Sequence, residues 1–264
     1  MTGLESIPQY IFTIYFFLTG LAIGSFVNVC IYRLPKKESI LTPRSHCTAC
    51  NTQILTRDNI PVLSYLLLGG KCRSCGEKIS PIYPAIEIIT AFLFTSVYLR
   101  FGLSMECLIY AMVVPTLVII TAIDIQHQII PDKITLPGIA FGLICGAYLN
   151  GIWDSLGGAL LGGGSFLLIS ELYFRLRGAV GMGGGDIKYI AAAGALLGWE
   201  KILVVIFLSA LIGALTGVMG LALKKLTFLS RIPFGPFLAM GTIAVIFFGD
   251  EIISLYLSTM IVKK

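Results

Sequence analysis

Two aspartates stand at the edges of long apolar runs. Asp124 closes one run, in AIDIQHQIIPDKIT, and Asp186 opens another sixty-two positions later, in GMGGGDIKYIAAAGALLG. Ionisable side chains at the edge of a membrane segment are costly and point to function. Two neighbouring carboxylates share a proton, so one can take a proton from water while the other protonates a peptide carbonyl. The pair therefore predicts acid–base hydrolysis of a peptide bond.

A single aspartate at a membrane edge has other interpretations, and these stay open at this point. It can cap a helix, contact lipid headgroups or belong to an ion path, so a transporter or ion-conducting protein is the alternative from a different class. Asp132, which follows Pro131, is expected to cap the next apolar segment.

Three glycines precede the second aspartate. Gly183, Gly184 and Gly185 carry no side chains, so a substrate backbone could approach Asp186 closely. They also permit a non-helical start to the segment that follows. The spacings of nucleotide-binding glycine loops are absent. Lys188 is expected either to steady Asp186 electrostatically or to reach lipid headgroups.

Four of the seven cysteines form two Cys-x2-Cys pairs, Cys47 with Cys50 and Cys72 with Cys75. This pattern resembles a four-thiolate zinc site, although two disulfides or redox-active pairs would use the same spacing. Zinc is favoured where thiols stay reduced. A closed four-cysteine site leaves no coordination position for catalysis, so its predicted role is to stabilise a small module.

The composition requires lipid as the solvent for most of the chain. Of 264 residues, 56% are hydrophobic and only 12% charged, which exceeds what a soluble domain of this size can bury. We expect an all-α polytopic membrane protein with about eight transmembrane helices. The expected spans are 10–31, 83–99, 108–123, 134–149, 156–173, 187–197, 202–223 and 234–260. The span at 187–197 is short, and it could run on into Trp199.

The expected organisation has three parts. Residues 1–32 hold the first span, which is a retained anchor because MTGLESIPQY lacks a basic leader and carries Glu5. Residues 33–82 form the four-cysteine module between the first and second spans, and residues 83–264 form a membrane domain with both aspartates. Glycines such as those in GGALLGGGS are expected to serve close helix packing.

Basic residues predict the orientation. With eight spans, fifteen of the 19 Lys and Arg residues fall on one side and four on the other. The positive-inside rule therefore places the cysteine module and both aspartates on the cytoplasmic side and both termini outside.

These motifs together resemble a known family, the bacterial type IV prepilin peptidases. The matching words are GSFVNVCIYRLP, PRSHCTAC, DNIPVLSYLLLGGKCRSCGEKIS, YPAIE, DIQHQIIPDKIT and GMGGGDIK, in the family's order and spacing. The resemblance runs from about residue 24 to 188. GxGD alone is shared with presenilin-like proteases, but its combination with the cysteine module is highly specific.

The resemblance implies an aspartic protease of the bacterial inner membrane. Members remove the basic leader of prepilins or pseudopilins, in pilus assembly or type II secretion. Many then N-methylate the new N-terminal residue with S-adenosylmethionine. The family's catalytic aspartates fall on Asp124 and Asp186, its GxGD on residues 183–186 and its tetrad on the four cysteines above.

A bifunctional enzyme is favoured because the module is complete, and a cleavage-only peptidase is the alternative. Glu87, at the edge of the second span, is a candidate for holding the substrate amine; a charge near Lys78 is the other. Prepilins or pseudopilins and membrane lipid are the expected partners, and nucleic acid is not.

Overall fold

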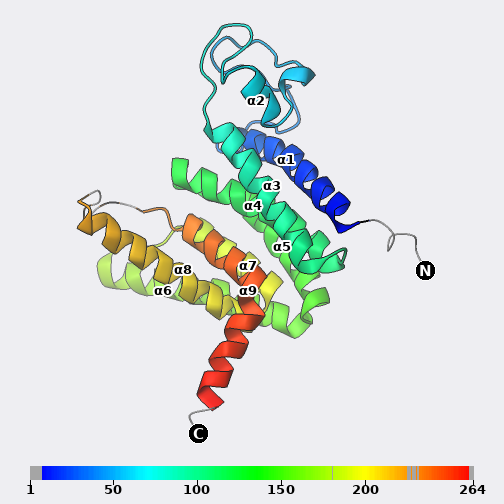
Figure 1. Ribbon diagram of the computed structural model, residues 1–264. Coiled ribbons are helices and arrows are strands. Elements are labelled where there is room, and N and C mark those ends of the chain that lie inside the picture. The colour runs from blue at the N-terminus through cyan, green and yellow to red at the C-terminus, as the bar shows by residue number, and fades with distance from the viewer. Residues whose placement is uncertain (1–7, 180, 225–226, 228–229, 231, 262–264) are drawn as a thin grey trace. The chain divides into compact units, whose positions relative to one another are not determined.

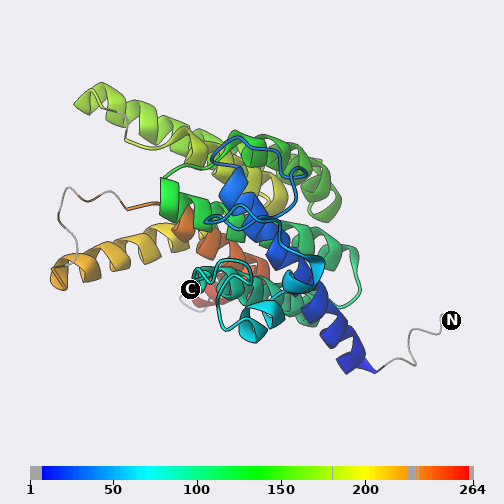
Figure 2. The same cartoon turned by 90° about the horizontal axis from the view of Figure 1, so that it is seen from above.

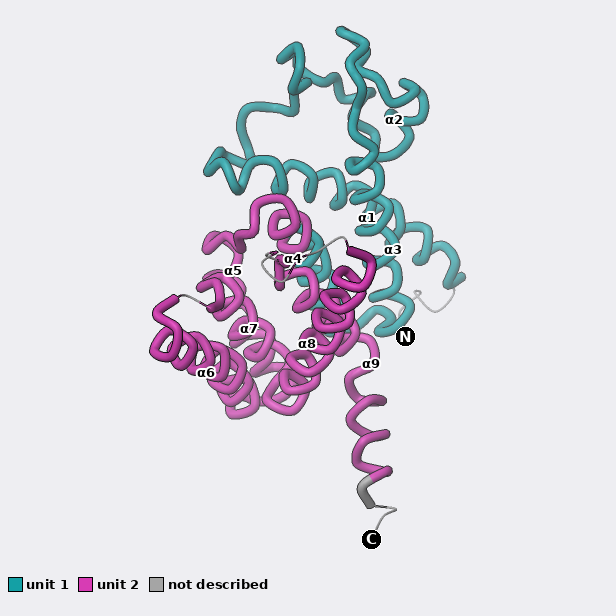
Figure 3. Tube along the Cα trace, turned by 90° about the vertical axis from the view of Figure 1, so that its left-hand side faces the viewer, with its two compact units in different colours: residues 1–119 teal, residues 120–264 magenta. Residues whose placement is uncertain are grey.

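The computed structural model describes residues 8–179, 181–224, 227, 230 and 232–261. These residues are helical, with loops and two isolated β-bridges, which confirms the expected all-α class. The chain divides into two compact units, Met1–Ile119 and Ile120–Lys264, and the division falls within one helix (Figure 3). Four of the basic residues used to predict orientation, Lys225, Arg231, Lys263 and Lys264, lie outside the described residues.

Unit 1 is built on two long apolar helices, α1 (Gln9–Arg33) and α3 (Ile82–Phe101), which pack against each other (Figure 1). Gly20 and Gly24 make this possible. A Cβ at Gly20 would lie 2.7 Å from the Cα of Ala91, and one at Gly24 would lie 2.6 Å from the Cα of Glu87. A Gly-x3-Gly pair thus lets the two backbones approach closely.

The connection between α1 and α3 is the cysteine module. It consists of loops with two short helices, η1 (Thr56–Asp58) and α2 (Leu63–Leu67), and Figure 2 shows it from above. Arg33, at the end of α1, is buried and donates hydrogen bonds to the carbonyl oxygens of Ser39 and Pro43 at 2.9 and 2.7 Å. This guanidinium fixes the first stretch of the module to the membrane helix.

Helix α4 (Met105–His127) begins in unit 1 and ends in unit 2. The other helices of unit 2 are α5 (Asp132–Leu149), α6 (Ile152–Arg177), α7 (Gly184–Leu197), α8 (Trp199–Ala222) and α9 (Gly235–Ile261). Seven helices among the described residues are long and apolar enough to cross a membrane. Helix α7 is the remaining expected span.

Helix α7 has only 14 residues, or about 21 Å at 1.5 Å per residue, against about 30 Å of hydrocarbon. It does not run on into Trp199, because Gly198 adopts φ 84° and breaks the helix there. The carbonyl groups freed by this early end are paired: Ser155 donates to Ala195 at 2.6 Å and Asn150 to Leu196 at 2.9 Å. Side chains thus replace the missing helix turn.

Glycines of the neighbouring helices hold α7 in place. A Cβ at Gly142 of α5 would lie 2.6 Å from the carbonyl oxygen of Ala192, and one at Gly162 of α6 would lie 2.7 Å from that of Ile190. Gly158 and Gly194 face each other backbone to backbone. The predicted packing role of these glycines is confirmed, and the short helix that begins beside Asp186 is tightly fixed.

Replacing Gly158 with alanine should destabilise the protein, because the new methyl group would collide with the backbone at Gly194. We expect a loss of about 1–3 kcal/mol, the usual range for overpacking, and a fall of several degrees in the unfolding temperature in detergent. Gly164→Ala, on the same helix with open space around it, is the control. Equal unfolding temperatures for the two variants would contradict this packing.

Candidate functional site

Both aspartates lie in unit 2, at ends of helices. Asp124 is in the last turn of α4 and is only 5% exposed. Asp186 is in the first turn of α7 and half-buried. The two carboxylates are close enough to interact electrostatically. Residues sixty-two positions apart in the chain are therefore brought together.

Asp124 is fixed by a backbone donor that the sequence analysis did not identify. The N–H of Gly235, at the start of α9, donates to Oδ2 of Asp124 at 2.8 Å in a buried hydrogen bond. A Cβ at position 235 would lie 2.7 Å from the same oxygen. Only glycine lets the backbone approach this carboxylate so closely.

The three glycines before Asp186 differ in what surrounds them. A Cβ at Gly185 would lie 2.8 Å from the Cβ of Ile130, so this glycine lets α7 pack on the link between α4 and α5. A Cβ at Gly183 would lie 3.2 Å from the carboxylate of Asp186, and Gly184 has open space. Packing explains Gly185, whereas the missing side chain at Gly183 leaves room beside the carboxylate and Gly184 faces open space.

Lys188 forms an ion pair with Asp132, whose Oδ1 lies 2.7 Å from its Nζ. The expected role of Asp132 as a helix cap is wrong: Pro131 occupies the N-cap position of α5, and no side chain caps it. The pair instead joins the start of α5 to the start of α7, close to where Gly185 of α7 packs on the link between α4 and α5.

The four cysteine sulfurs of the module lie within 4.8 Å of one another, and Cys47 and Cys75 are 3.9 Å apart. Zn–S bonds of about 2.3 Å in a tetrahedron place sulfurs about 3.8 Å apart. All seven cysteines are free thiols, so the disulfide alternative finds no support. The cluster fits a four-coordinate metal ion.

The two cysteine pairs are held by the same turn. Asn51 and Gly76, each four residues after a first cysteine, have φ of 57° and 73° and donate to the carbonyl oxygens of Cys47 and Cys72. The N–H groups of those cysteines in turn donate to Thr52 and Glu77. The two cysteine pairs therefore have the same backbone geometry, which suits four thiols that bind one metal ion together.

The thiols are not equally acidic. A hydrogen bond with Thr52 lowers the pKa of Cys50 to about 6, and backbone N–H groups of Cys75 and Ser74 lower the pKa of Cys72. Although the N–H of Glu77 favours its thiolate, desolvation and the neighbouring thiols raise the pKa of Cys75 to about 12. A divalent cation would offset the accumulated negative charge of four thiolates.

Glu87 lies in unit 1, on α3, and is 8% exposed. Its Oε2 accepts a hydrogen bond from the N–H of Val62 at 2.7 Å. It belongs to a different unit from the two aspartates and lies beside the cysteine module.

An all-helical chain with several membrane-spanning helices, a four-thiol cluster and two interacting carboxylates is a multi-pass membrane protein with features of an aspartic protease. Residues 18–101 match the Bacterial Peptidase A24 N-terminal domain, and residues 111–218 match the Type IV leader peptidase family. The chain belongs to the type IV leader peptidase family.

Similar proteins cover nearly the whole chain. A protein of Pseudomonas putida is 35% identical over 95% of this chain and 95% of its own length. A protein of Bacillus subtilis is 38% identical over 91% of this chain and 96% of its own length. A protein of Pseudomonas aeruginosa is 35% identical over 91% of this chain and 91% of its own length. Each is named prepilin leader peptidase/N-methyltransferase. No solved structure matches the chain.

Replacing Gly235 with alanine should displace the Asp124 carboxylate, because the methyl group would collide with Oδ2. A misplacement of about 1 Å can cost about 10²-fold in rate, so we expect a loss of peptidase activity of that order. Gly217→Ala, where a Cβ would make ordinary contact with Ile232 at 3.8 Å, is the control. Full activity of Gly235→Ala would show that this hydrogen bond does not position the carboxylate.

Proposed function

We propose that the protein removes the basic leader of type IV prepilins or pseudopilins and then N-methylates the new N-terminus. The observation that carries the cleavage reaction is the interaction of two carboxylates from helix ends far apart in the chain, one of them fixed by the N–H of Gly235. Family membership supports the reaction, and the names of the relatives support both activities.

In the proposed mechanism, Asp124 and Asp186 act as one unit that shares a proton. The ionised carboxylate takes a proton from water, and the water oxygen attacks the scissile carbonyl carbon. The protonated carboxyl group donates to the carbonyl oxygen. A proton then passes to the leaving amine as the C–N bond breaks. The open space at Gly184, together with the missing side chain at Gly183 next to the Asp186 carboxylate, would let a substrate backbone approach.

We propose that both aspartates and the cysteine module face the cytoplasm, with the termini on the other side of the bacterial inner membrane. The distribution of Lys and Arg supports this orientation. A prepilin has a membrane-embedded helix and a basic leader in the cytoplasm, so its scissile bond would lie at the depth of helix ends such as those carrying Asp124 and Asp186. Lys188, with Asp132, would fix the start of α7.

We propose zinc as the ion held by Cys47, Cys50, Cys72 and Cys75, with a structural role. S-adenosylmethionine is the proposed methyl donor. Zinc supplies folding stability to a module with few buried side chains, and the donor supplies an electrophilic methyl group.

Asp124→Asn and Asp186→Asn should each reduce leader removal by about 10²–10⁴-fold, because each variant lacks one member of the acid–base pair. Mass spectrometry of the processed prepilin detects both leader loss and the added methyl group. Asp250→Asn, which alters an exposed partner of Lys201, should cleave normally. Near-normal cleavage by either dyad variant would refute the assignment, and a cleaved but never methylated wild-type product would identify a cleavage-only enzyme.

Replacing Cys72 with serine should remove bound zinc, which elemental analysis of the purified protein measures. The module would also become more sensitive to proteolysis, because three thiolates hold zinc less tightly than four. Cys145→Ser, outside the cluster, should keep a full complement of zinc. Unchanged zinc content in Cys72→Ser would exclude the four-cysteine site.

A further inference from the structure

A cavity of about 530 Å³ lies within unit 1, between the cysteine module and the ends of α1 and α3 that join it. Its volume falls in the range of small-molecule sites, about 300–1,000 Å³. Cys47 and Cys72 contribute to its wall, and Glu87 of α3 contributes to its lining. The cavity therefore joins the module to a buried carboxylate.

Glu87 has hydrogen bonds but no cation. Its partners are the N–H of Val62 and the hydroxyl group of Ser25. No ion pair formed by the described residues includes it. Arg33, Arg73 and Lys78 also line the cavity. The guanidinium of Arg33 is occupied by backbone carbonyl groups and that of Arg73 by Asp58, and Lys78 forms no ion pair with Glu87 among the described residues. A buried carboxylate is costly unless a positive charge or further donors meet it, so this geometry favours a cationic ligand.

Aromatic rings supply a second feature that attracts cations. Tyr83 lies one helical turn before Glu87 on α3, and both residues line the cavity. Residues four apart on a helix share a face. Tyr32, also in the lining, already holds a cation: the Nζ of Lys36 lies 3.5 Å from the centre of its ring. Tyrosine rings beside a carboxylate suit a sulfonium or ammonium group.

The backbone facing Glu87 is strained. Val62 has φ 60° and ψ −49°, a conformation that β-branched residues avoid. Such strain persists where surrounding contacts enforce it, and it clusters at functional sites. Here the strained conformation coincides with the N–H group that donates to Glu87.

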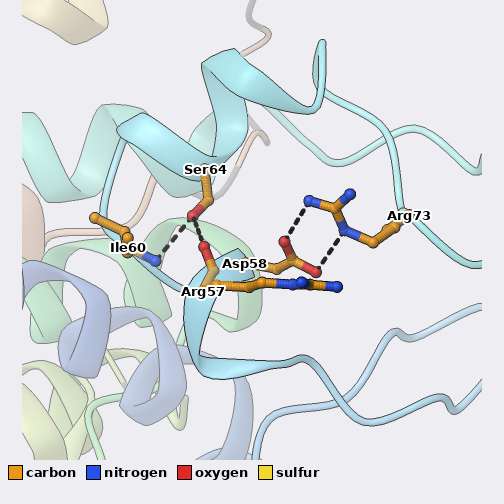
Figure 4. A network of polar contacts seen from close by, with 5 residues as sticks. All are labelled: Arg57, Asp58, Ile60, Ser64 and Arg73. Atoms are coloured by element: carbon orange, nitrogen blue, oxygen red, sulfur yellow. Dashed lines mark hydrogen bonds and ion pairs between the residues drawn. The ribbon is translucent and has the colours of Figure 1, made fainter.

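A network of polar contacts holds the segments before and after Val62, through Arg57, Asp58, Ile60, Ser64 and Arg73 (Figure 4). Ser64 accepts a hydrogen bond from the N–H of Ile60 at 2.9 Å and donates to the carbonyl oxygen of Arg57 at 3.1 Å. Asp58 accepts two hydrogen bonds from Arg73, at 2.8 and 2.7 Å, which tie this segment to the second cysteine pair. The wall of the cavity is therefore built from residues on both sides of Val62.

We propose that this cavity is the site of methyl transfer, and the inference rests on the methylation proposed above. Tyr83 holds the sulfonium group of the donor, and Glu87 receives the proton of the substrate's N-terminal ammonium group. The zinc-bound cysteines shape the wall and take no part in the reaction.

The step balances as follows. The ammonium group gives one proton to the Glu87 carboxylate and becomes an amine. The amine's electron pair forms the new N–C bond to the methyl carbon while the C–S bond breaks and its electron pair stays on sulfur. The products are a methylated ammonium group and a neutral thioether, and the proton on Glu87 passes to water.

Calorimetric titration of the purified full-length protein with S-adenosylmethionine tests the location. Tyr83→Leu should weaken binding by about 3–30-fold, the value of a cation–π contact, while Tyr83→Phe keeps the ring and should bind as wild type. Leader removal should be unchanged in both. Unchanged binding in Tyr83→Leu, with a wild-type protein that does methylate, would overturn the location and leave the proposed function intact. A wild-type protein that cleaves but neither binds the donor nor methylates would overturn both the location of the site and the proposed methylation.

Glu87→Gln tests the proton acceptor. The amide oxygen can still accept the N–H of Val62, so folding, leader removal and donor binding should be retained. Methyl transfer should fall by about 10²–10⁴-fold, as a loss of kcat and not as a rise in the KM for the donor. Glu38→Gln removes an exposed carboxylate that does not line the cavity and should methylate normally. A wild-type rate of methylation in Glu87→Gln would overturn the role of Glu87.

Discussion

Polar groups surrounded by apolar helices must find their partners within the protein, and this requirement governs the parts of the structure that matter for function. The Asp124 carboxylate accepts a hydrogen bond from the N–H of Gly235. The carbonyl groups at the early end of α7 accept hydrogen bonds from the side chains of Asn150 and Ser155. Because lipid offers no hydrogen bonds, these contacts have no competitor, and they fix both the carboxylate of Asp124 and the helix that carries Asp186.

The two proposed reactions use different physical means in different units. Hydrolysis in unit 2 needs two acidic groups that share a proton and a backbone open enough to admit a substrate. Methyl transfer in unit 1 needs one group that holds the sulfonium group of the donor and one that accepts the ammonium proton, the roles proposed for Tyr83 and Glu87 of the cavity lining. The cysteine cluster lies beside the proposed site of methyl transfer and is not part of the proposed site of hydrolysis. This division explains how a metal site without an open coordination position can still matter to an enzyme.

Motifs carried by short stretches could be predicted from the sequence. The Cys-x2-Cys pairs indicated a cluster of four thiols, and the two aspartates next to apolar runs indicated a pair of carboxylates, by residue type and spacing. Gly235 could not be found, because an isolated glycine before an apolar run has no signal until Asp124 lies against it. The pairing of Lys188 with Asp132 and the end of α7 at Gly198 depend likewise on contacts between distant segments.

The spatial relation of the two aspartates is tested most directly by cross-linking in membranes. Cysteines would replace Asp124 and Asp186 in a protein whose Cys30, Cys107 and Cys145 are alanine, and thiol-specific cross-linkers of graded length would be applied. The shortest reagents should join the two positions. A cysteine at Asp250, which pairs with Lys201 just beyond the far end of α7, should link to position 186 only through long reagents. Failure of every short reagent at 124 and 186 would contradict the account.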